Sequence, residues 1–364
     1  MIGAIKSNGP TLLANWGRSP YVGRMSHSET DQRQALVRRV QRRISCDGKI
    51  VFAAIPSMLE DYVARCEHVF SAMGRELDGA QRDRLRQVLS NQLTEAFSQS
   101  HRSTITVSYR AEIAQPLSYS ITTQIAKLTD AYEVWVKTRQ PPYFGLHADA
   151  KVVAVAQSSG NAAQCPALDI GAGTGRNALT LARQGHPVDA VELTPGFANI
   201  LRDTATKEML PVRVICEDVF RSNTELRADY GLIVVSEVVS DFRSIAEWRA
   251  LLELSARCLR VGGKLLVNAF VTQDHYFTDP AAREFGQQAY SFFMTPAEIQ
   301  SAIGTLPLKL ISSDRVYDFE KSHLPADAWP PTPWYEEWVS GQDIFDLPRE
   351  ASPVTLMWLV LEKT

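Results

Sequence analysis

One stretch of the sequence combines acidic residues and glycines in a spacing that suits a nucleotide-like ligand. The stretch begins at Ala167 and reads ALDIGAGTGRNALTLARQGHPVDAVE. Gly171, Gly173 and Gly175 follow a short apolar run, so the backbone there can turn tightly and approach a ligand without Cβ atoms in the way. Glu192 ends the next apolar run, where a carboxylate suits the two hydroxyls of a ribose.

The glycine spacing and one acid separate this site from a dinucleotide site. Dinucleotide folds carry G-x-G-x-x-G, with the pyrophosphate at the helix N-terminus. This chain has G-x-G-x-G, with Asp169 two residues before the first glycine. A carboxylate there repels a pyrophosphate and attracts a ligand that carries ammonium and sulfonium charges. A nicotinamide dehydrogenase is therefore the weakest alternative.

The stretch resembles motif I of the class I S-adenosylmethionine-dependent methyltransferases. Its glycine loop runs on into Arg176 and Asn177, as in the small-molecule and tellurite-resistance-type branch of that family. The resemblance covers about residues 165–364, and it departs from the family's L-x-P-G-G turn at Val261, which alters the stiffness of that turn. It implies an enzyme that transfers a methyl group and uses S-adenosylmethionine as cofactor.

The resemblance also assigns cofactor contacts to residues near the strand ends. Asp169 and the three glycines match the loop that holds the amino-acid end of the cofactor, and Glu192 matches the acid that binds the ribose hydroxyls. Asp218 matches the position that reads the adenine amino group, with Val219 beside it for ring contact. A helix cap is the alternative role for Asp218. Glu237, after the fourth strand, completes the predicted cofactor side.

Candidate residues for the acceptor side lie where loops leave the carboxyl ends of the later strands, the usual ligand crevice of such sheets. We predict catalytic roles for Asp241, in SEVVSDF, and for His275 and Tyr276, in TQDHYF. Methyl transfer from a sulfonium needs an aligned nucleophile and a dry site, so no fixed triad is expected. The alternatives are a helix cap for Asp241 and a plain surface position for His275.

Two aromatic stretches are predicted to contact the acceptor. Tyr143 and His147 lie in YFGLH before the core, and Trp334 and Tyr335 lie in WYEEW, between the last two strands. Aromatic faces favour a sulfonium cation and exclude water, although packing at a domain interface explains the tryptophans equally well. The run QPPYF, residues 140–144, resembles the amine-binding signature of nucleic-acid methyltransferases. That signature follows the fourth strand, whereas QPPYF precedes the first strand, so we do not assign it that role.

Strands that alternate with helices must position these residues. Apolar runs at 167–170, 188–191, 212–216, 230–235 and 264–270 are separated by helical patterns. Such alternation predicts a parallel sheet with helices on both faces. In the family that the chain resembles, two further strands, here 308–311 and 356–361, close the sheet with an antiparallel edge. The expected fold is α/β, with a Rossmann-like, doubly wound, seven-stranded sheet.

The first part of the chain is expected to form an accessory domain. Residues 1–30 are rich in Gly, Ser, Pro and Asn and predict a flexible arm. Residues 31–157 predict a mainly helical accessory domain with a small β-hairpin, and residues 158–364 the class I methyltransferase domain. For a chain of 364 residues, two domains are the default expectation.

Composition and charge narrow the class of partner. The chain is 45% hydrophobic and 22% charged, with a net charge of −3, and no apolar run is long enough to span a membrane. The first 150 residues hold 19 Lys and Arg against 14 Asp and Glu, whereas the remainder holds 19 against 27. An acidic catalytic half argues against nucleic acid as the main partner.

Five scattered cysteines form no C-x-x-C pair, and no secretory signal is evident, so we expect a cytoplasmic location and no metal site.

The predicted function is transfer of a methyl group to an N, O or S nucleophile of a small molecule, such as a specialised metabolite. The alternatives are an RNA or protein methyltransferase that docks through the basic residues 38–43, and a non-catalytic cofactor-binding module. The sequence leaves the acceptor and the oligomeric state open.

Overall fold

The computed structural model describes residues 27–41, 43–113, 115–221, 225–276 and 278–364. It consists of two compact units: Met1–Gln99 with Ser103–Ile125, and Ser100–Arg102 with Ala126–Thr364. Most of the arm expected at residues 1–30 lies outside the described residues, and residues 27–30 begin a helix. Among the helices described, none combines the length and the apolar character that a membrane crossing requires.

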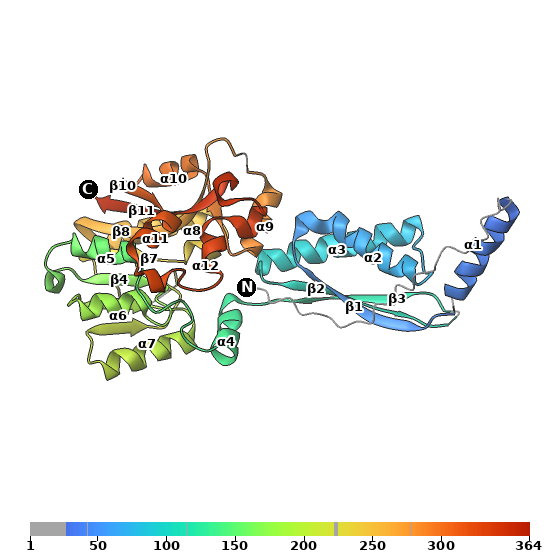
Figure 1. The fold of residues 1–364 in the computed structure, drawn as a ribbon, viewed down its shortest axis with the longest axis horizontal. Coiled ribbons are helices and arrows are strands. Elements are labelled where there is room, and N and C mark those ends of the chain that lie inside the picture. Colours follow the sequence, from blue (N-terminus) through green and yellow to red (C-terminus); the bar gives the residue numbers. More distant parts are fainter. Residues whose placement is uncertain (1–26, 42, 114, 222–224, 277) are drawn as a thin grey trace. The chain divides into compact units, whose positions relative to one another are not determined.

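The first unit is built on a three-stranded antiparallel sheet. Its elements are α1 (His27–Gln41), β1 (Cys46–Ala53), α2 (Leu59–Ala72), α3 (Gly79–Gln99), β2 (Thr104–Ala111) and β3 (Ser118–Gln124). β2 lies between β1 and β3, and α2 and α3 lie along one face of the sheet (Figure 1). Side chains from both helices and from the sheet, including Phe70, Leu89 and Val107, form the core of this unit.

The segments predicted to form a β-hairpin are β2 and β3, which pair antiparallel, and a strand that was not predicted, β1, makes the sheet three-stranded. β1 pairs with β2 along its full length, and Ile50 stands opposite Val107. The alternation of buried and exposed side chains along β1 is weak in the sequence. Gly48 offers no side chain on the face that buries Phe52, and Val51 is exposed on the other face. A two-residue period with those exceptions is hard to distinguish from an irregular segment.

The second unit is an α/β unit with a mixed sheet. Its helices are α4 (Leu128–Thr138), α5 (Ala150–Gln157), α6 (Arg176–Arg183), α7 (Pro195–Lys207), α8 (Ile245–Cys258), α9 (Pro280–Gln288), α10 (Pro296–Ile303), α11 (Val316–His323), α12 (Tyr335–Val339) and α13 (Gln342–Phe345). Its strands are β4 (Ala167–Ile170), β5 (Val188–Val191), β6 (Val212–Ile215), β7 (Tyr230–Val235), β8 (Leu259–Thr272), β9 (Phe293–Met294), β10 (Leu308–Arg315) and β11 (Val354–Lys363).

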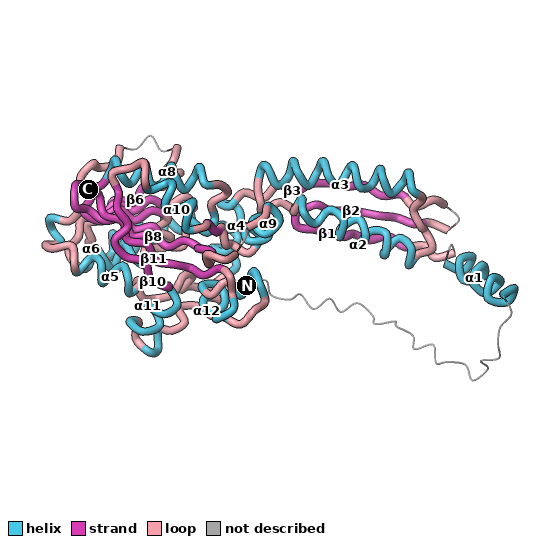
Figure 2. The backbone as a smooth tube through the Cα atoms, turned by 90° about the horizontal axis from the view of Figure 1, so that it is seen from above, coloured by secondary structure: helices cyan, strands magenta, loops and turns pink. Residues whose placement is uncertain are grey.

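The order of these strands is β10-β11-β8-β7-β4-β5-β6, and the short β9 pairs with β8. The strands from β8 to β6 are parallel, and β11 runs antiparallel to both of its neighbours. Helices pack on both faces: α5, α6, α7, α11 and α12 contribute to one core cluster, and α8 and α10 to the other (Figure 2). The predicted doubly wound α/β sheet with an antiparallel closing pair is confirmed.

The predicted domain boundary, between residues 157 and 158, differs from the division in the structure. α4 and α5 were assigned to the accessory domain, but both fold with the second unit. α4 contacts α7, and α5 packs against α6 and α11. Val152 of α5 is fully buried in the core of this unit. The run AKVVAVAQ is too short and too uniformly apolar for its periodicity to reveal a helix or the partner of that helix.

Candidate functional site

The glycine loop joins β4 to α6. Gly171, Gly173 and Gly175 have φ angles of +72°, +55° and +95°. These values lie in the left-handed region, which residues with a Cβ rarely adopt. Neighbouring side chains add a steric reason, because a Cβ on Gly175 would overlap Leu201 and one on Gly173 would lie 3.1 Å from the Phe144 ring. The loop therefore depends on glycine at these positions.

Asp169, near the end of β4, carries an unpaired carboxylate oxygen. Its side chain is buried, and its Oδ2 has no hydrogen-bond partner within the part of the chain that the structure describes. Burial, followed by the negative charge of Asp149, raises the pKa of Asp169 to about 7, against the opposing effect of a hydrogen bond from the Ala178 backbone. A buried acceptor left open beside a glycine loop fits a cationic donor such as an ammonium group.

Glu192 follows β5 and holds the glycine loop. Its Oε2 accepts a hydrogen bond from the N–H of Gly173 at 2.8 Å, and its Oε1 accepts one from the N–H of Thr194 at 2.7 Å. Burial raises the pKa of Glu192 above its ordinary value, against the opposing effect of these hydrogen bonds. Each carboxylate oxygen keeps a second lone pair, so Glu192 can also accept hydrogen bonds from ligand hydroxyls.

Asp218 follows β6 and lies in a turn. Its Oδ1 accepts a hydrogen bond from the N–H of Phe220 at 2.9 Å, and its Oδ2 lies 3.7 Å from Nε of Arg221. Val219 packs against the buried cluster of this side of the sheet, and the Phe220 ring lies 5.9 Å from the Phe242 ring. The hydrogen bond to Phe220 is that of an Asx turn rather than of a helix cap.

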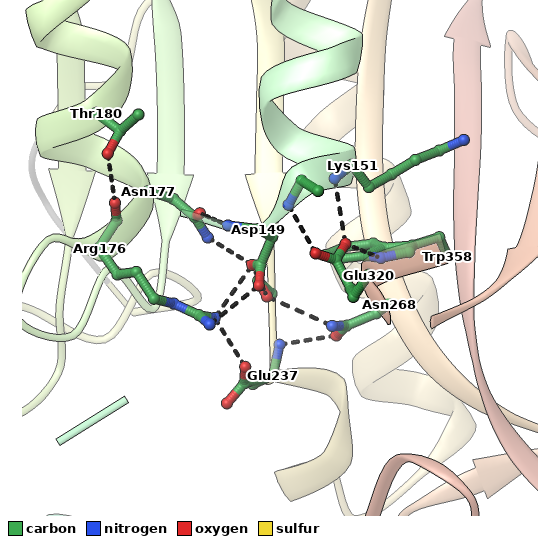
Figure 3. A network of polar contacts seen from close by, with 11 residues as sticks. Asp149, Lys151, Arg176, Asn177, Thr180, Glu237, Asn268, Glu320 and Trp358 are labelled. Atoms are coloured by element: carbon green, nitrogen blue, oxygen red, sulfur yellow. Dashed lines mark hydrogen bonds and ion pairs between the residues drawn. The ribbon is translucent and has the colours of Figure 1, made fainter. Parts of the chain in front are cut away.

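A buried network of charged and polar side chains lies beside the loop, with Asp149 at its centre (Figure 3). Arg176, the first residue of α6, forms ion pairs with Asp149 at 3.0 Å and with Glu237 at 2.7 Å. Asn177 and Ser236 also donate to Asp149, at 2.9 Å and 2.7 Å. Two carboxylates share one guanidinium, so the network retains negative charge that favours a cationic ligand nearby.

Glu237 has an uncommon backbone conformation. Its φ angle is +61°, and its N–H donates to Oδ1 of Asn268 at 2.7 Å (Figure 3). Burial raises the pKa of the Glu237 carboxyl, and the ion pair with Arg176 opposes that rise. Left-handed residues other than glycine cluster at functional sites, because the surrounding structure must maintain their strain. Around Glu237, the hydrogen bond to Asn268 and the ion pair with Arg176 hold this conformation.

Glu320, in α11, links the network to the segment between the last two strands. Its Oε2 accepts the N–H of Ala150 at 2.7 Å, and its Oε1 accepts the N–H of Lys151 at 3.1 Å (Figure 3). Nε1 of Trp358 donates to the same Oε1 at 2.9 Å. Glu320 thereby caps the first turn of α5, directly after Asp149. Burial, followed by the charge of Asp149, raises the pKa of Glu320 to about 7.

Tyr335, at the start of α12, lies close to these carboxylates. It is fully buried, and its hydroxyl has no hydrogen-bond partner among the described residues. Burial, followed by the charges of Asp149 and Glu237, raises the pKa of Tyr335 well above its ordinary value. Trp334 is half-buried, and its ring lies 5.5 Å from that of Trp338. Of the two residues predicted in this segment, Tyr335 thus lies close enough to Asp149 and Glu237 for their charges to raise its pKa, whereas Trp334 packs against Trp338.

Asp241 has a hydrogen-bond partner on each carboxylate oxygen. Its Oδ1 lies 3.0 Å from Nη2 of Arg102, and its Oδ2 accepts a hydrogen bond from the Tyr132 hydroxyl at 2.9 Å. The Arg102 guanidinium also donates to the carbonyl of Gln288 at 3.1 Å and lies 3.1 Å from the centroid of the Tyr290 ring. Burial raises the pKa of Asp241, opposed by Arg102. The structure therefore shows Asp241 as an anchoring carboxylate.

The structure does not join His275 and Tyr276 to these acids. His275 is exposed on the turn after β8, and across the described ranges no contact connects it with Asp241 or Glu237. The Tyr276 ring lies 5.4 Å from the ring of Phe345 and packs against the core of the unit.

The YFGLH segment reaches the glycine loop through Phe144. The Phe144 ring lies over Gly173, and its centroid is 5.1 Å from that of Phe197. Tyr143 is buried, with its ring 5.4 Å from Phe197, whereas His147 is exposed. The apolar neighbour of the loop is therefore Phe144, which lies between the two residues predicted from the sequence.

Sequence reasoning missed most of the polar network around the loop. The missed residues are Asp149, Arg176, Ser236, Asn268 and Glu320. A signal existed for Asp149, because a short acidic residue directly before an apolar run is typical of a helix start. Arg176 adjoins the glycine loop, so its position was also informative. Glu320 lies in a segment whose sequence carries no motif.

Comparison with known proteins identifies one matching family. Residues 167–263 match the family described as "Methyltransferase domain". The matched segment contains the glycine loop and ends at Gly263, within β8. The match supports enzymatic activity and is consistent with S-adenosylmethionine as cofactor. It does not distinguish the branches of the family.

One relative in the comparison with curated proteins is Hemagglutinin 1 from Eikenella corrodens, which is 30% identical to this chain over 122 residues. The aligned segment covers 34% of this chain and 40% of that protein. The chain thus spans less than half the length of this relative.

Similar solved structures include methyltransferases and one cyclase. A candidate sarcosine dimethylglycine methyltransferase from Galdieria sulphuraria is 14% identical, with a TM-score of 0.48 over 65% of this chain and 99% of that chain. Geranyl diphosphate C-methyltransferase from Streptomyces coelicolor A3(2) is 12% identical, with a TM-score of 0.48 over 66% and 94%. The [4+2]-cyclase SpnF is 14% identical, with a TM-score of 0.44 over 65% and 95%. Such low identities leave the activity of this chain to be argued from its own residues.

Proposed function

We propose that this chain, which carries a methyltransferase domain at residues 167–263, transfers a methyl group from S-adenosylmethionine to a small molecule. The observation that carries the proposal is the unpaired Oδ2 of Asp169 beside three glycines with positive φ. A ligand with an ammonium group satisfies that oxygen, and a ligand with a ribose diol meets Glu192. S-adenosylmethionine brings both groups.

In this proposal, residues at or just beyond the carboxyl ends of the neighbouring strands β4, β5 and β6 hold the cofactor. Asp169 and the backbone of the glycine loop bind its amino-acid end, and Glu192 binds its ribose hydroxyls. Asp218 and Val219, after β6, contact the adenine. Glu237 lies at the end of the adjoining strand β7 and adds negative charge beside the positive sulfur.

On the acceptor side, the chain must align a nucleophile, exclude water and take up a proton. When bound, S-adenosylmethionine supplies an electrophilic methyl group, which an N, O or S nucleophile takes up as the C–S bond breaks and its electron pair returns to sulfur. Glu237, with its raised pKa, is the base we assign to the acceptor proton, and the unpaired hydroxyl of Tyr335 is available to hydrogen-bond the acceptor. Asp241 positions Tyr132 and Arg102.

The remaining predicted contacts belong to the walls of the acceptor site. Tyr143 and Trp334 exclude water, while His147, His275 and Tyr276 contact the parts of the acceptor that do not react. The continuation of the glycine loop into Arg-Asn supports a place in the small-molecule and tellurite-resistance-type branch. We further propose a cytoplasmic location and a small-molecule acceptor rather than a nucleic acid.

Equilibrium binding of labelled S-adenosylmethionine to wild type, Asp169→Asn and Glu192→Gln tests the cofactor site. Each variant removes a charged hydrogen-bond acceptor, so we expect affinity to fall at least about tenfold in both. Asp229→Asn is the control, because it makes the same charge change at a carboxylate that is 61% exposed and paired with Arg227. Unchanged affinity in both site variants contradicts the assignment.

Turnover separates an enzyme from a binding module. The full chain is incubated with labelled S-adenosylmethionine and fractions of a small-molecule extract, and S-adenosylhomocysteine is measured. We expect its formation to depend on particular fractions and to be slower in Asp169→Asn at the same concentration of S-adenosylmethionine. Tight binding without fraction-dependent turnover would favour a non-catalytic role.

A further inference from the structure

Carboxylates outnumber cations in the buried network around Asp149 (Figure 3). Asp149 and Glu237 both pair with Arg176, at 3.0 Å and 2.7 Å, and these three side chains are at most 13% exposed. Glu320 adjoins them at the start of α5, where neutral N–H groups donate to its carboxylate. When the acids are ionised, these four side chains therefore hold an excess of negative charge in a site that contains little water.

S-adenosylmethionine balances only part of this excess. In the proposed function its ammonium group faces Asp169, a fourth carboxylate, so the sulfonium is the one positive charge that it brings to the network. The carboxylate at its amino-acid end adds a further negative charge. Because buried charge is costly without a partner, the site suits a second cation, and the acceptor is the ligand that can carry it.

An unpaired hydroxyl points to a ligand at the same place. Tyr335 is 1% exposed, and its hydroxyl has no hydrogen-bond partner among the residues that the structure describes. Burial, followed by the charges of Asp149, Glu237 and Glu320, raises its pKa, so the hydroxyl lies near these acids. Buried polar groups nearly always have a partner in native proteins, and a hydroxyl accepts hydrogen bonds from N–H groups.

Two more polar atoms in the segment before α12 lack partners. Nε1 of Trp329 and Oγ1 of Thr332 are buried, and neither has a hydrogen-bond partner in the described ranges. The ring of Trp329 lies 5.8 Å from that of Tyr335. The segment from Trp329 to Tyr335 thus offers one N–H and two hydroxyl groups to the polar atoms of a ligand.

The negative charge of the network distinguishes among the possible nucleophiles. An alcohol or a thiol loses its proton as it attacks, and the negative charge that develops on oxygen or sulfur is repelled by the neighbouring carboxylates. An amine attacks as a neutral group, and positive charge passes from the sulfonium to nitrogen. The carboxylates that attract the sulfonium then also stabilise the charge that develops on nitrogen in the transition state.

We propose that the acceptor is an amine that is methylated at nitrogen, an inference that rests on the proposed function. The amine enters as an ammonium group and gives one proton to the carboxylate of Glu237. Its nitrogen lone pair then forms the N–C bond, while the C–S bond breaks and its electron pair goes to sulfur, which leaves a methylated ammonium ion. The hydroxyl of Tyr335 accepts a hydrogen bond from an N–H of the amine and aligns the nitrogen.

The position of a transferred methyl group tests the proposal directly. The full chain is incubated with S-adenosylmethionine whose methyl carbon is labelled for NMR, together with the extract fractions that support turnover. The chemical shift of the labelled carbon shows whether it is bound to N, O or S. We expect an N-methyl product, and we expect turnover to be lost when the amines of the extract are first acetylated with an N-hydroxysuccinimide ester. An O-methyl or S-methyl product would overturn the inference and leave the proposed function intact.

Tyr335→Phe tests the assigned contact, because it removes the hydroxyl and keeps the ring. We expect kcat/KM for the active fraction to fall about threefold to tenfold, as one hydrogen bond is lost, and the affinity for S-adenosylmethionine to stay unchanged. Tyr119→Phe is the control. It makes the same change in the first unit, on a ring that stacks on Phe70, and should alter kcat/KM less than about twofold.

The outcomes separate this inference from the proposed function. An unchanged kcat/KM in Tyr335→Phe would contradict the contact between Tyr335 and the amine. Binding of S-adenosylmethionine without a methylated product from any fraction would count against the proposed function, and this inference would fall with it. Turnover that survives acetylation of the amines would contradict the amine acceptor alone.

Discussion

Asp149 and Arg176 form a paired contact between the start of α5 and the start of α6, with Oδ1–Nη1 and Oδ2–Nη2 distances of 3.0 Å and 3.1 Å. Their side chains are only 2% and 8% exposed, and Arg176 also reaches Glu237. Buried charges are tolerated only when their partners remain in place. This ion pair therefore fixes the first residue of α6, directly after the glycine loop.

Asp149→Ala is expected to lower the free energy of unfolding by about 3–5 kcal/mol, because it leaves the buried Arg176 with one carboxylate instead of two. It also removes the acceptor for Asn177 and Ser236. Chemical denaturation monitored by tryptophan fluorescence measures the change. Glu208→Ala is the control. It breaks the exposed Arg183–Glu208 ion pair, with side chains 49% and 36% exposed, and should lower the free energy of unfolding far less. Equal losses in the two variants would contradict this account.

The affinity for S-adenosylmethionine should depend on the ionisation of Asp169. Its pKa in the native protein is raised to about 7, so the carboxyl is largely protonated below that pH. Only the ionised form pairs with an ammonium group. Binding should therefore weaken by up to about tenfold as the pH falls from about 7.5 to about 6.

The control for this pH dependence is Asp169→Asn, whose affinity should be low and nearly flat over the same range. The ionisation of the ligand's own amino group affects the affinity of both proteins in the same way. The ratio of wild-type to variant affinity at each pH therefore cancels that contribution. A ratio that stays constant with pH would show that Asp169 does not face the ammonium.

The sequence predicted those parts of the site that local chemistry determines. Glycines at positive φ and acids at the ends of buried strands are both encoded within a few residues. For the same reason, the alternating helices and strands of the second unit were predictable.

The network around Asp149 depends instead on contacts over long sequence separations. Asp149 meets Ser236 across 87 residues, and Glu320 meets Ala150 across 170. Neither partner is marked by a motif, so only the folded structure shows that Ser236 and Glu320 meet the start of α5. The unpredicted strand β1 belongs to the same category, since its pairing with β2 determines its structure more than its own pattern does.

Gly175→Ala should destabilise the protein by more than its left-handed φ alone explains. A Cβ at this position would lie 2.8 Å from Cγ of Leu179 and would overlap Leu201. Gly160→Ala is the matched control, with a φ angle of +87° and no heavy atom within 4 Å of the added Cβ. We expect a loss of about 1–2 kcal/mol for the control, and a further loss of about 1–3 kcal/mol for Gly175→Ala from overpacking. Similar melting temperatures for the two variants would indicate that the loop has room for a side chain.

Glu320 should make stability depend on pH in a direction opposite to that of a salt-bridged acid. Its pKa is raised to about 7 in the native protein, against an ordinary value of 4.5, so the native state holds the proton more tightly than the unfolded chain does. Its contribution is thus most favourable below about pH 4.5 and is lost as the pH rises through about 7, by an amount on the order of 3 kcal/mol.

Glu320→Gln isolates this contribution, because it keeps one acceptor oxygen for the first turn of α5 and cannot ionise. Free energies of unfolding are measured for wild type and variant between about pH 4.5 and pH 7.5. The difference between wild type and variant should change steadily in favour of the variant as the pH rises. Asp169 titrates in the same range in both proteins and cancels from the difference. Parallel profiles would mean that Glu320 ionises as readily in the native protein as in the unfolded chain, and would contradict the prediction.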